Sequence, residues 1–363
     1  MAIGDRVLMG PGPANVYPEV VAALGRPMLG HLDPEFLAVL EETVDRLRAV
    51  FRTDNRLTFP LSGTGSAGME AAFVNTLRPG DVAVVGVNGL FGQRMAEIAG
   101  RLGAEVVTVE APWGEPLDPS AVESAHPEPA VIAVVHAETS TGVRNDVEAV
   151  AHAKGGALMI ADVVTSLGGV EVELDDWGVD VAYSGTQKCL GVPPGLAPFT
   201  MSQRARERRV ERPSSWYLDA GLIAGYVEAE GGRTYHHTAP VSMVFALHAG
   251  LGVLLEEGLE ASWARHQACG ELLQAGLESM GLELLAPKDH RLPQLTTVRV
   301  PDLPGGLGEA DVRRMLLDRY RIEIGAGVGP LAGRVWRIGC MGHTARPANV
   351  TLLLAALADV LGR

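Results

Sequence analysis

Lysine is scarce in this sequence, and long apolar runs are missing. Lys154, Lys188 and Lys288 are the only lysines among 30 basic residues, so arginine supplies the rest. No apolar stretch approaches the roughly 20 residues that a membrane-spanning helix needs. The N-terminus lacks the basic and apolar regions of a signal peptide. We therefore expect a cytoplasmic protein with no membrane partner.

Cysteine and net positive charge are also lacking. Cys189, Cys269 and Cys340 are odd in number and widely spaced, with no CxxC pair, which predicts neither a disulfide framework nor a zinc site. The formal net charge of −14 argues against a nucleic-acid partner, because phosphate backbones are bound by basic surfaces. With 47% apolar residues, the 363-residue chain can build one large domain and a smaller one.

Short apolar runs alternate with helical patterns through the first two thirds of the chain. Helical spacing covers about 34–51, 66–77 and 91–102. The strand-like runs are "RLTFPLSG", "DVAVVGV", "AEVVTVE", "AVIAVVHAE", "ALMIADVV" and "VDVAYSG". Continuous Val/Ile/Ala runs between helices are typical of a parallel sheet covered on both faces, so the pattern predicts an α/β domain.

The pattern changes after about residue 242. A helical stretch over 242–280 is broken or bent near Gly258. Strand-like runs and helices that favour a smaller α+β unit follow at about 295–301, 309–320, 321–327, 335–340 and 346–361. The first 17 residues are rich in Gly and Pro and predict an irregular arm. We expect an N-terminal arm over 1–20, a large domain over 21–258 and a small C-terminal domain over 259–363.

Polar residues that follow the apolar runs are candidate ligand-binding residues, because ligands of open α/β sheets bind at the carboxyl ends of the strands. The segment 62–66 (Ser-Gly-Thr-Gly-Ser) precedes a helix, whose N-terminal N–H groups favour a phosphate. It is not a Walker A loop, and the GxG pattern alone is weak. A polar turn spans 136–142. Asp162 ends a buried strand, where it could bind a ligand or simply cap the next turn.

Lys188 lies in "SGTQKCLG", at a strand end next to glycines. Lysine forms Schiff bases, and burial lowers its pKa toward nucleophilic reactivity. Lys154 is instead placed as a C-terminal helix cation, and Lys288 lies in a polar loop. A salt-bridged structural lysine is the alternative for Lys188. A phosphate cup, a buried aspartate and a Schiff-base lysine together are what pyridoxal phosphate requires.

The chain resembles the alanine–glyoxylate and serine–glyoxylate aminotransferases, which are class V aminotransferases of fold type I among the pyridoxal-phosphate enzymes. The resemblance runs through "GPGPANVYPEV", "SGTGSAGMEAAFVNTLRPGD", "VNGLFGQRM", "HAETSTGV", "ADVVTSLGGVEVELDDWGVDVAYSGTQKCLGVPPGLA", "YHHTAPVSM" and "WRIGCMGHTA". It implies a large domain with a mostly parallel seven-stranded sheet between helices, and a smaller C-terminal α+β domain.

The resemblance also implies a cofactor site for pyridoxal 5'-phosphate. Lys188 would form the Schiff base and then shuttle the proton, and Asp162 would pair with the pyridinium nitrogen. Val164 would pack on one face of the ring. Phe91 stands where the family often has a tryptophan on the other face, so the stacking area is smaller. The phosphate would be held by Thr64, Gly65, Ser66 and Gln187.

Substrate and subunit contacts are implied in the same way. Arg337 would grip the substrate carboxylate with its planar fork, and Thr139 would face both cofactor and substrate. His31 resembles a residue that approaches the second subunit's site and could select the donor. Tyr235 and Thr238 would reach the phosphate of that subunit, which implies an obligate homodimer with shared active sites.

The expected reaction is a ping-pong transamination. A small amino acid, alanine or serine, would give its amino group to a 2-oxo acid, with glyoxylate as the expected acceptor. The alternatives are an enzyme of the cysteine desulfurase type, one of the pyridoxamine–pyruvate aminotransferase type, or a non-catalytic α/β binding protein. His236 and His237 are not expected to bind a metal, because adjacent residues of a strand point to opposite sides.

Overall fold

A seven-stranded sheet forms the centre of the computed structural model, which describes residues 4–228 and 233–363. The strand order is β2-β10-β9-β8-β5-β3-β4, and every neighbouring pair is parallel except those that β10 makes with β2 and β9. The strands are β2 (Leu57–Ser62), β3 (Val82–Val87), β4 (Glu105–Glu110), β5 (Val131–Val135), β8 (Leu158–Asp162), β9 (Val181–Tyr183) and β10 (Leu196–Met201). The predicted mostly parallel sheet is confirmed, but the sequence pattern did not indicate β10.

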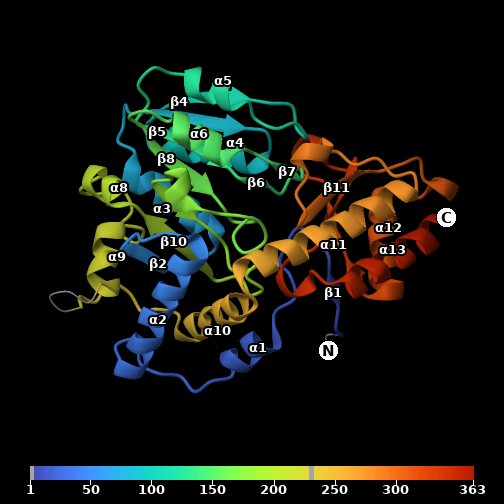
Figure 1. Cartoon of the computed structure of the whole chain (residues 1–363), viewed down its shortest axis with the longest axis horizontal. Helices are drawn as coiled ribbons and strands as arrows, with labels where there is room; N and C mark the ends of the chain where they lie inside the picture. The colour runs from blue at the N-terminus through green and yellow to red at the C-terminus, as the bar shows by residue number, and fades with distance from the viewer. Residues whose placement is uncertain (1–3, 229–232) are drawn as a thin grey trace.

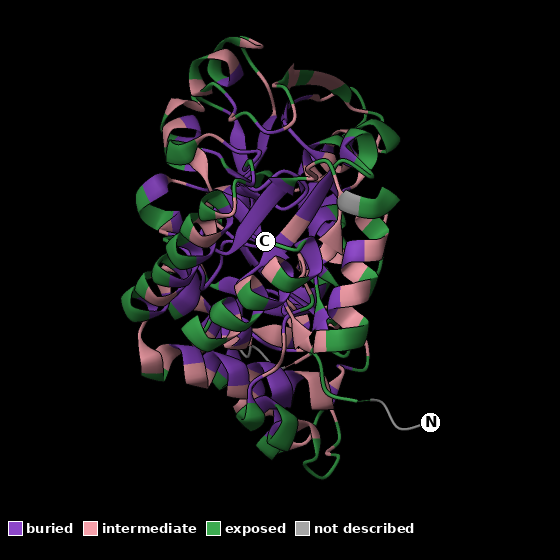
Figure 2. Cartoon of the chain, turned by 90° about the vertical axis from the view of Figure 1, so that its right-hand side faces the viewer, coloured by how far each residue is buried: buried purple, intermediate pink, exposed green. Residues whose placement is uncertain are grey.

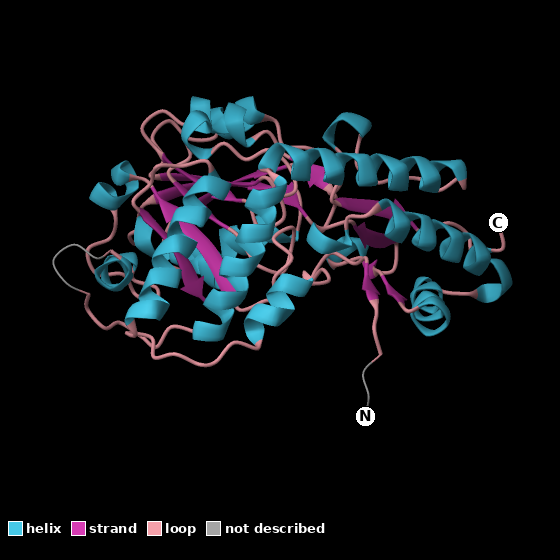
Figure 3. Ribbon diagram, turned by 60° about the horizontal axis from the view of Figure 1, so that its bottom comes forward, coloured by secondary structure: helices cyan, strands magenta, loops and turns pink. Residues whose placement is uncertain are grey.

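Helices cover both faces of this sheet (Figure 3). Side chains of one strand alternate between two separate apolar cores: Val84 belongs to one, and Ala83 and Val85 to the other. The first core is completed by α1 (Pro18–Leu24), α2 (Pro34–Phe51), α5 (Pro119–Ser124), α6 (Val147–Ala153), α7 (Leu174–Trp177) and α10 (Val241–Glu257). The second core is completed by α3 (Gly65–Thr76), α4 (Leu90–Arg101), α8 (Gln203–Arg208) and α9 (Ala220–Val227). The strands are therefore buried on both sides, as the purple ribbon in Figure 2 shows.

The C-terminal part of the chain builds a second, smaller layer structure, drawn in orange and red in Figure 1. Its antiparallel sheet has the order β11-β14-β13 and packs around the buried Trp336 with three helices. The elements are α11 (Leu259–Ser279), β11 (Leu295–Arg299), α12 (Glu309–Tyr320), β13 (Gly325–Ala326), β14 (Val335–Gly339) and α13 (Pro347–Leu361). Short 3₁₀ turns lie at Lys288–His290, Pro304–Gly306, Gly329–Leu331 and Gly342–Thr344.

The expected break near Gly258 separates α10 from α11, which meet at 86°. Within the described residues, no single helix is long and apolar enough to cross a membrane. The bent α10–α11 pair meets that criterion only when its two helices are taken together.

The N-terminal segment is not irregular throughout. β1 (Val7–Leu8) pairs in parallel with β12 (Ile322–Glu323), and Met9 lies in the C-terminal apolar core. The prediction of an irregular arm was wrong at these residues, because the pairing strand comes from the far end of the sequence. This pairing carries the following segment, residues 10–13, toward Lys188.

Candidate active site

The candidate residues gather at the carboxyl ends of the central strands. Asp162 is the last residue of β8, and Lys188 follows β9 after a short turn. Gly65 opens α3 directly after β2, and Thr139 lies in the turn between β6 (Ala137–Glu138) and β7 (Val143–Arg144). Parallel strands end at the same edge of a sheet, so residues distant in sequence meet here.

Lys188 is buried, with 8% of its surface exposed. Its Nζ donates a hydrogen bond to the carbonyl of Pro11, and Gly12 packs so closely that a Cβ there would lie 2.8 Å from Nζ. Burial and the nearby charge of Arg337 lower the pKa of Lys188 to about 8. Among the described residues, Lys188 makes no ion pair with a carboxylate. The amine is therefore poised for nucleophilic chemistry rather than held in a structural salt bridge.

Asp162 accepts two hydrogen bonds from its own surroundings. Its Oδ1 takes the N–H of Val164 at 2.9 Å, and its Oδ2 takes the hydroxyl of the buried Tyr183 at 3.0 Å. Burial raises the pKa of Asp162 to about 7, although both donors oppose that rise. A buried carboxylate of this kind is best satisfied by a further cationic or N–H partner.

The N-terminus of α3 provides uncapped N–H groups close to Val164. The first N–H groups of a helix have no partner within it, and the side chain of Thr64 makes no capping hydrogen bond. A Cβ on Gly65 would lie 3.2 Å from Val164 Cγ2, so the helix start adjoins the Asp162 turn. Ser66 accepts a hydrogen bond from Arg94 at 3.3 Å, which adds a positive charge. This end of the helix favours a phosphate.

Gln187 precedes the lysine and has a side-chain oxygen, Oε1, that is buried without a hydrogen-bond partner in the described structure. A Cβ on Gly185 would lie 2.9 Å from this atom, which shows how closely the turn packs against it. The buried amide is best explained by a polar group bound at the site, because an unpaired buried oxygen is costly.

Arg337 lies in β14 of the small domain and reaches across to the large domain. Its Nε donates to the carbonyl of Ala326 at 2.7 Å, and its Nη1 donates to the carbonyl of Thr139 at 3.2 Å. Burial lowers the pKa of Arg337, and within the described residues no carboxylate forms an ion pair with it. A half-buried guanidinium without a counterion is suited to bind a carboxylate ligand.

Phe91 is the second residue of α4 and is half-buried. Its N–H donates to Glu138 at 3.1 Å, and the guanidinium of Arg94 lies 5.1 Å from its ring centre. The ring therefore lies at the same edge as Thr139 and Val164.

Three predicted residues lie together in a separate place. The rings of His31 and Tyr235 are 5.2 Å apart, and the Tyr235 hydroxyl lies 3.3 Å from the Thr238 hydroxyl. Tyr235 is 61% exposed, and the described contacts of this cluster include none with Lys188. One copy of the chain thus does not join these three residues to the rest of the site.

His236 and His237 lie outside the strands, and their Nδ1 atoms are 2.8 Å apart. The prediction that they point to opposite sides was therefore wrong, since it assumed a strand. His237 also contacts the Ser62 hydroxyl at 2.6 Å. Within the parts of the chain that the structure describes, no group of three or more His, Cys, Asp or Glu residues is arranged to hold a metal ion.

Three contributors to the site were not predicted. Glu138 bonds to the start of α4, Tyr183 bonds to Asp162, and Pro11 accepts from Lys188. Glu138 follows an apolar run much as Asp162 does, so the same signal could have identified it. Tyr183 sits within a strand run, and Pro11 within a Gly/Pro-rich segment, and neither pattern carries a functional signal.

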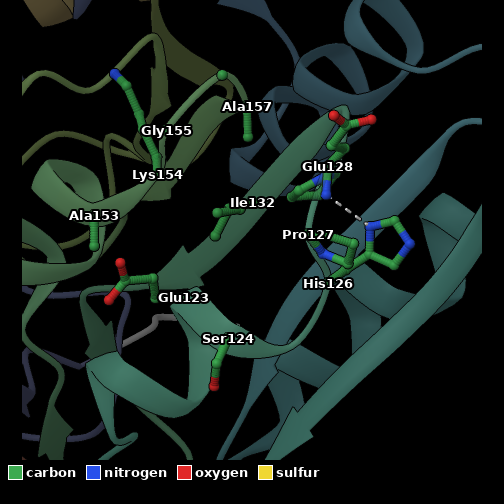
Figure 4. Close-up of a pocket in the computed structure, with 12 residues that line it drawn as sticks. Glu123, Ser124, His126, Pro127, Glu128, Ile132, Ala153, Lys154, Gly155 and Ala157 are labelled. Carbon is green, nitrogen blue, oxygen red and sulfur yellow. Dashed lines mark hydrogen bonds between the residues drawn. The ribbon is translucent and has the colours of Figure 1, made fainter.

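A hollow of about 710 Å³ lies on the opposite side of the sheet, at the amino ends of β5 and β8 (Figure 4). Two of its polar groups have partners within the fold: Glu128 N–H donates to His126 at 3.3 Å, and Lys154 forms an ion pair with the buried Asp180 at 2.9 Å. Lys154 is thus the structural lysine, and this hollow does not belong to the strand-end site.

The residues present fit pyridoxal phosphate. The buried amine of Lys188 can bond to its aldehyde, Asp162 can pair with its ring nitrogen, and the start of α3 with Gln187 can bind its phosphate. The uncapped N–H groups at the start of α3 are donors that the phosphate would satisfy, and Gln187 would donate to it through its side-chain Nε2.

The family model for class V aminotransferases matches residues 13–335. The chain is 47% identical to a solved alanine–glyoxylate aminotransferase from Nostoc sp., with a TM-score of 0.94, covering 99% of this chain and 96% of that one. It is 39% identical to the (S)-ureidoglycine–glyoxylate transaminase of Bacillus subtilis (strain 168), covering 99% and 91%. It is 40% identical to the alanine–glyoxylate aminotransferase of Callithrix jacchus, covering 99% and 89%.

Proposed function

This chain belongs to the class V aminotransferase family, and we propose that it transfers the amino group of a small amino acid, alanine or serine, to glyoxylate. The enzyme is a transaminase with pyridoxal phosphate as its cofactor. The observation that supports the substrate class is the Arg337 guanidinium, which lies half-buried beside Thr139 and forms no ion pair with a carboxylate of the described residues. The relatives that take glyoxylate cover nearly the whole chain.

Bound at this site, pyridoxal phosphate supplies the electron sink that makes the substrate α-proton acidic. Lys188 Nζ takes that proton and returns it, which requires a neutral amine. The pKa lowered to about 8 increases the fraction of neutral amine relative to an ordinary lysine. Asp162 holds the ring nitrogen, and Tyr183 orients Asp162. Arg337 binds the carboxylate of the amino acid and then that of the 2-oxo acid, so one grip serves both halves of the reaction.

We infer that the active form is a homodimer in which a second copy supplies Tyr235, Thr238 and His31. Tyr235 is exposed in the single chain, as are the large side chains of Met28, Leu32 and Trp216. In the proposed dimer, the second copy would cover these side chains. His31 Nε2 is buried without a partner among the described residues, and a bound donor could satisfy it.

The desulfurase alternative is disfavoured by the cysteines. Cys189, Cys269 and Cys340 are all buried, and burial raises the pKa of each thiol. A persulfide-forming cysteine needs an accessible thiolate.

A donor–acceptor panel tests the proposal. Purified holoenzyme is given alanine, serine, (S)-ureidoglycine or pyridoxamine as donor, with glyoxylate or pyruvate as acceptor, and product formation is followed. We expect the highest kcat/KM for alanine or serine with glyoxylate. A preference for (S)-ureidoglycine would support the activity named for the Bacillus relative instead. Turnover with pyridoxamine and pyruvate alone would contradict the proposal, as would the absence of any turnover.

A further inference from the structure

Glu138 is a fully buried carboxylate that the proposed reaction does not use. It ends β6, directly before Thr139, and none of its surface is exposed. Within the described residues it forms no ion pair with an arginine or lysine. Its charge acts on Lys188 and Arg337 and raises the pKa of each, and hydrogen bonds satisfy its two oxygens.

Four donors surround Glu138. Its Oε1 accepts the N–H of Ser140 at 3.0 Å and the hydroxyl of Ser140 at 2.6 Å. Its Oε2 accepts the N–H groups of Phe91 at 3.1 Å and Gly92 at 3.4 Å. Three of these donors are backbone N–H groups, which cannot accept a hydrogen bond. A protonated Glu138 would therefore find no acceptor among them for its own O–H. The arrangement therefore favours the ionised carboxylate, although burial raises the pKa of Glu138.

The same contacts cap helix α4 by residues that are remote in sequence. Its N-cap residue, Gly89, has no side chain to bond the first N–H groups. Ser140 Oγ accepts the N–H of Leu90 at 2.9 Å, and Glu138 accepts those of Phe91 and Gly92. The first three N–H groups of α4 thus all donate hydrogen bonds to the side chains of Glu138 and Ser140. A carboxylate at this end also complements the helix dipole.

The backbone at Gly89 packs tightly against Glu138 and Ser140. A Cβ on Gly89 would lie 2.4 Å from Glu138 Cγ, from Glu138 Cδ and from Ser140 Oγ. The backbone of the helix start therefore lies in direct contact with the carboxylate.

Glu138 joins two parts of the active site. On one side it fixes the position of Phe91 at the start of α4. On the other side it and Ser140 flank Thr139, whose carbonyl accepts from Arg337. The aromatic ring and the carboxylate-binding arginine are thus held relative to each other through one buried side chain.

We propose that Glu138 is a positioning residue that sets Phe91 against the cofactor and the Thr139 turn against Arg337. This inference rests on the proposed roles of Phe91 and Arg337. Its consequence is that loss of the carboxylate loosens cofactor binding and substrate binding together, while the fold is retained.

The test compares Glu138→Gln and Glu138→Ala with Asp219→Asn. Asp219 is a matched control: it is a buried carboxylate that caps α9 by accepting the N–H groups of Gly221 and Leu222. Glutamine keeps one acceptor oxygen, so it should partly rescue the alanine variant. Three quantities are measured: cofactor release from the holoenzyme without substrate, KM and kcat for the 2-oxo acid, and amide hydrogen exchange in the cofactor-free protein.

We expect Glu138→Gln to raise both the rate of cofactor release and KM by about tenfold, because each lost hydrogen bond involves a charged acceptor. Glu138→Ala should raise both by more. Amides of 90–92 and 140 should exchange faster in both variants, and Asp219→Asn should leave all of these unchanged. The proposal is overturned if Glu138→Gln alters only the melting temperature, or if its release rate and KM stay within about twofold of the wild type. Cofactor release and hydrogen exchange need no substrate, so they remain decisive even if glyoxylate is not the acceptor. If the alanine variant does not fold, the glutamine variant alone decides.

Discussion

The positive charge of Arg337 affects the protonation of Lys188. After burial, the charge of Arg337 is the largest cause of the lowered pKa of Lys188. The cation proposed to bind the substrate carboxylate therefore also favours the neutral form of the proposed catalytic amine.

Replacing Arg337 by lysine keeps the charge but removes the planar fork. We expect KM for the 2-oxo acid to rise about 10- to 100-fold, because a charge-assisted bidentate contact contributes about 1.5–3 kcal/mol. Cofactor release should stay unchanged. Steady-state kinetics measure the effect, and Arg334→Lys, at an exposed position in the preceding turn, is the control. Equal KM values in the two variants would remove Arg337 from the substrate site.

Asp162 should make the cofactor-free protein sensitive to pH. Its folded-state pKa of about 7 exceeds the ordinary value of 3.8, so the protonated form is favoured by folding. Its stabilising contribution is complete below about pH 4 and is lost as the pH rises through 7. Without cofactor, the melting temperature of the wild type should therefore fall between pH 5 and pH 8 when it is compared with that of Asp162→Asn.

The asparagine variant stays neutral throughout and keeps the carbonyl that accepts the N–H of Val164. Bound cofactor should abolish the difference in the wild type, since its protonated ring nitrogen stabilises the carboxylate. A melting-temperature difference that is constant with pH would show that Asp162 is already ionised without cofactor.

Single residues were predictable where their chemistry is rare. Lys188 was identified because a sequence poor in lysine keeps one at a strand end, and Asp162 because it ends a buried run. Glu138 could have been identified by the same signal, but its role could not, since its partners, Phe91 and Gly92, lie far earlier in the chain. No local pattern reveals that a polar turn will bond to the start of a distant helix.

At the scale of elements, periodicity located the helices well. α2 spans the predicted 34–51, and α12 spans the predicted 309–320. β10 was missed because it directly follows the Pro- and Gly-rich segment 193–195 and itself contains Pro198, so the whole region has the composition of a loop. β1 was missed because its partner, β12, is remote in sequence.

The N-terminal segment should matter to the site although it lies outside the central sheet. Gly12 has φ of +107°, and a Cβ there would lie 2.7 Å from Lys188 Cδ. Gly12→Ala must therefore displace Lys188 or the segment itself. We expect at least a tenfold loss of kcat/KM and weaker cofactor binding, on the order of the 1–2 kcal/mol or more that such a clash costs.

Gly80→Ala is the control for this variant. Gly80 also has positive φ, +87°, but a Cβ there would meet no atom within 4 Å. Both variants carry the backbone strain of a left-handed alanine, so both should melt at a lower temperature. If their activities fall equally, the contact with Lys188 has no role.

The whole molecule is expected to function as a pair of chains. Within one chain, Tyr235 contacts both Thr238 and His31, and none of the described contacts of these residues involves Lys188. Periodicity in the sequence could not predict that these residues lie at a subunit interface, because subunit contacts produce no periodic pattern. The expectation came from the resemblance.

Mixing two inactive variants tests the shared site. Lys188→Ala lacks the amine, and the double variant Tyr235→Ala, Thr238→Ala lacks the proposed phosphate contacts. After co-refolding, mixed dimers contain one site with all three residues, so activity should return to about a quarter of the wild type for random pairing of two copies. Each variant alone should stay inactive. No recovery in a mixture that forms dimers would place Tyr235 and Thr238 outside the neighbouring site.

The central claim is that Lys188 alone carries the cofactor. Because the chain has only three lysines, borohydride reduction of the holoenzyme followed by peptide mass analysis gives a direct answer. The account predicts one pyridoxyl group, on the peptide that contains Lys188, and none on peptides that contain Lys154 or Lys288. A group on either of those lysines, or no attached group at all, would contradict it.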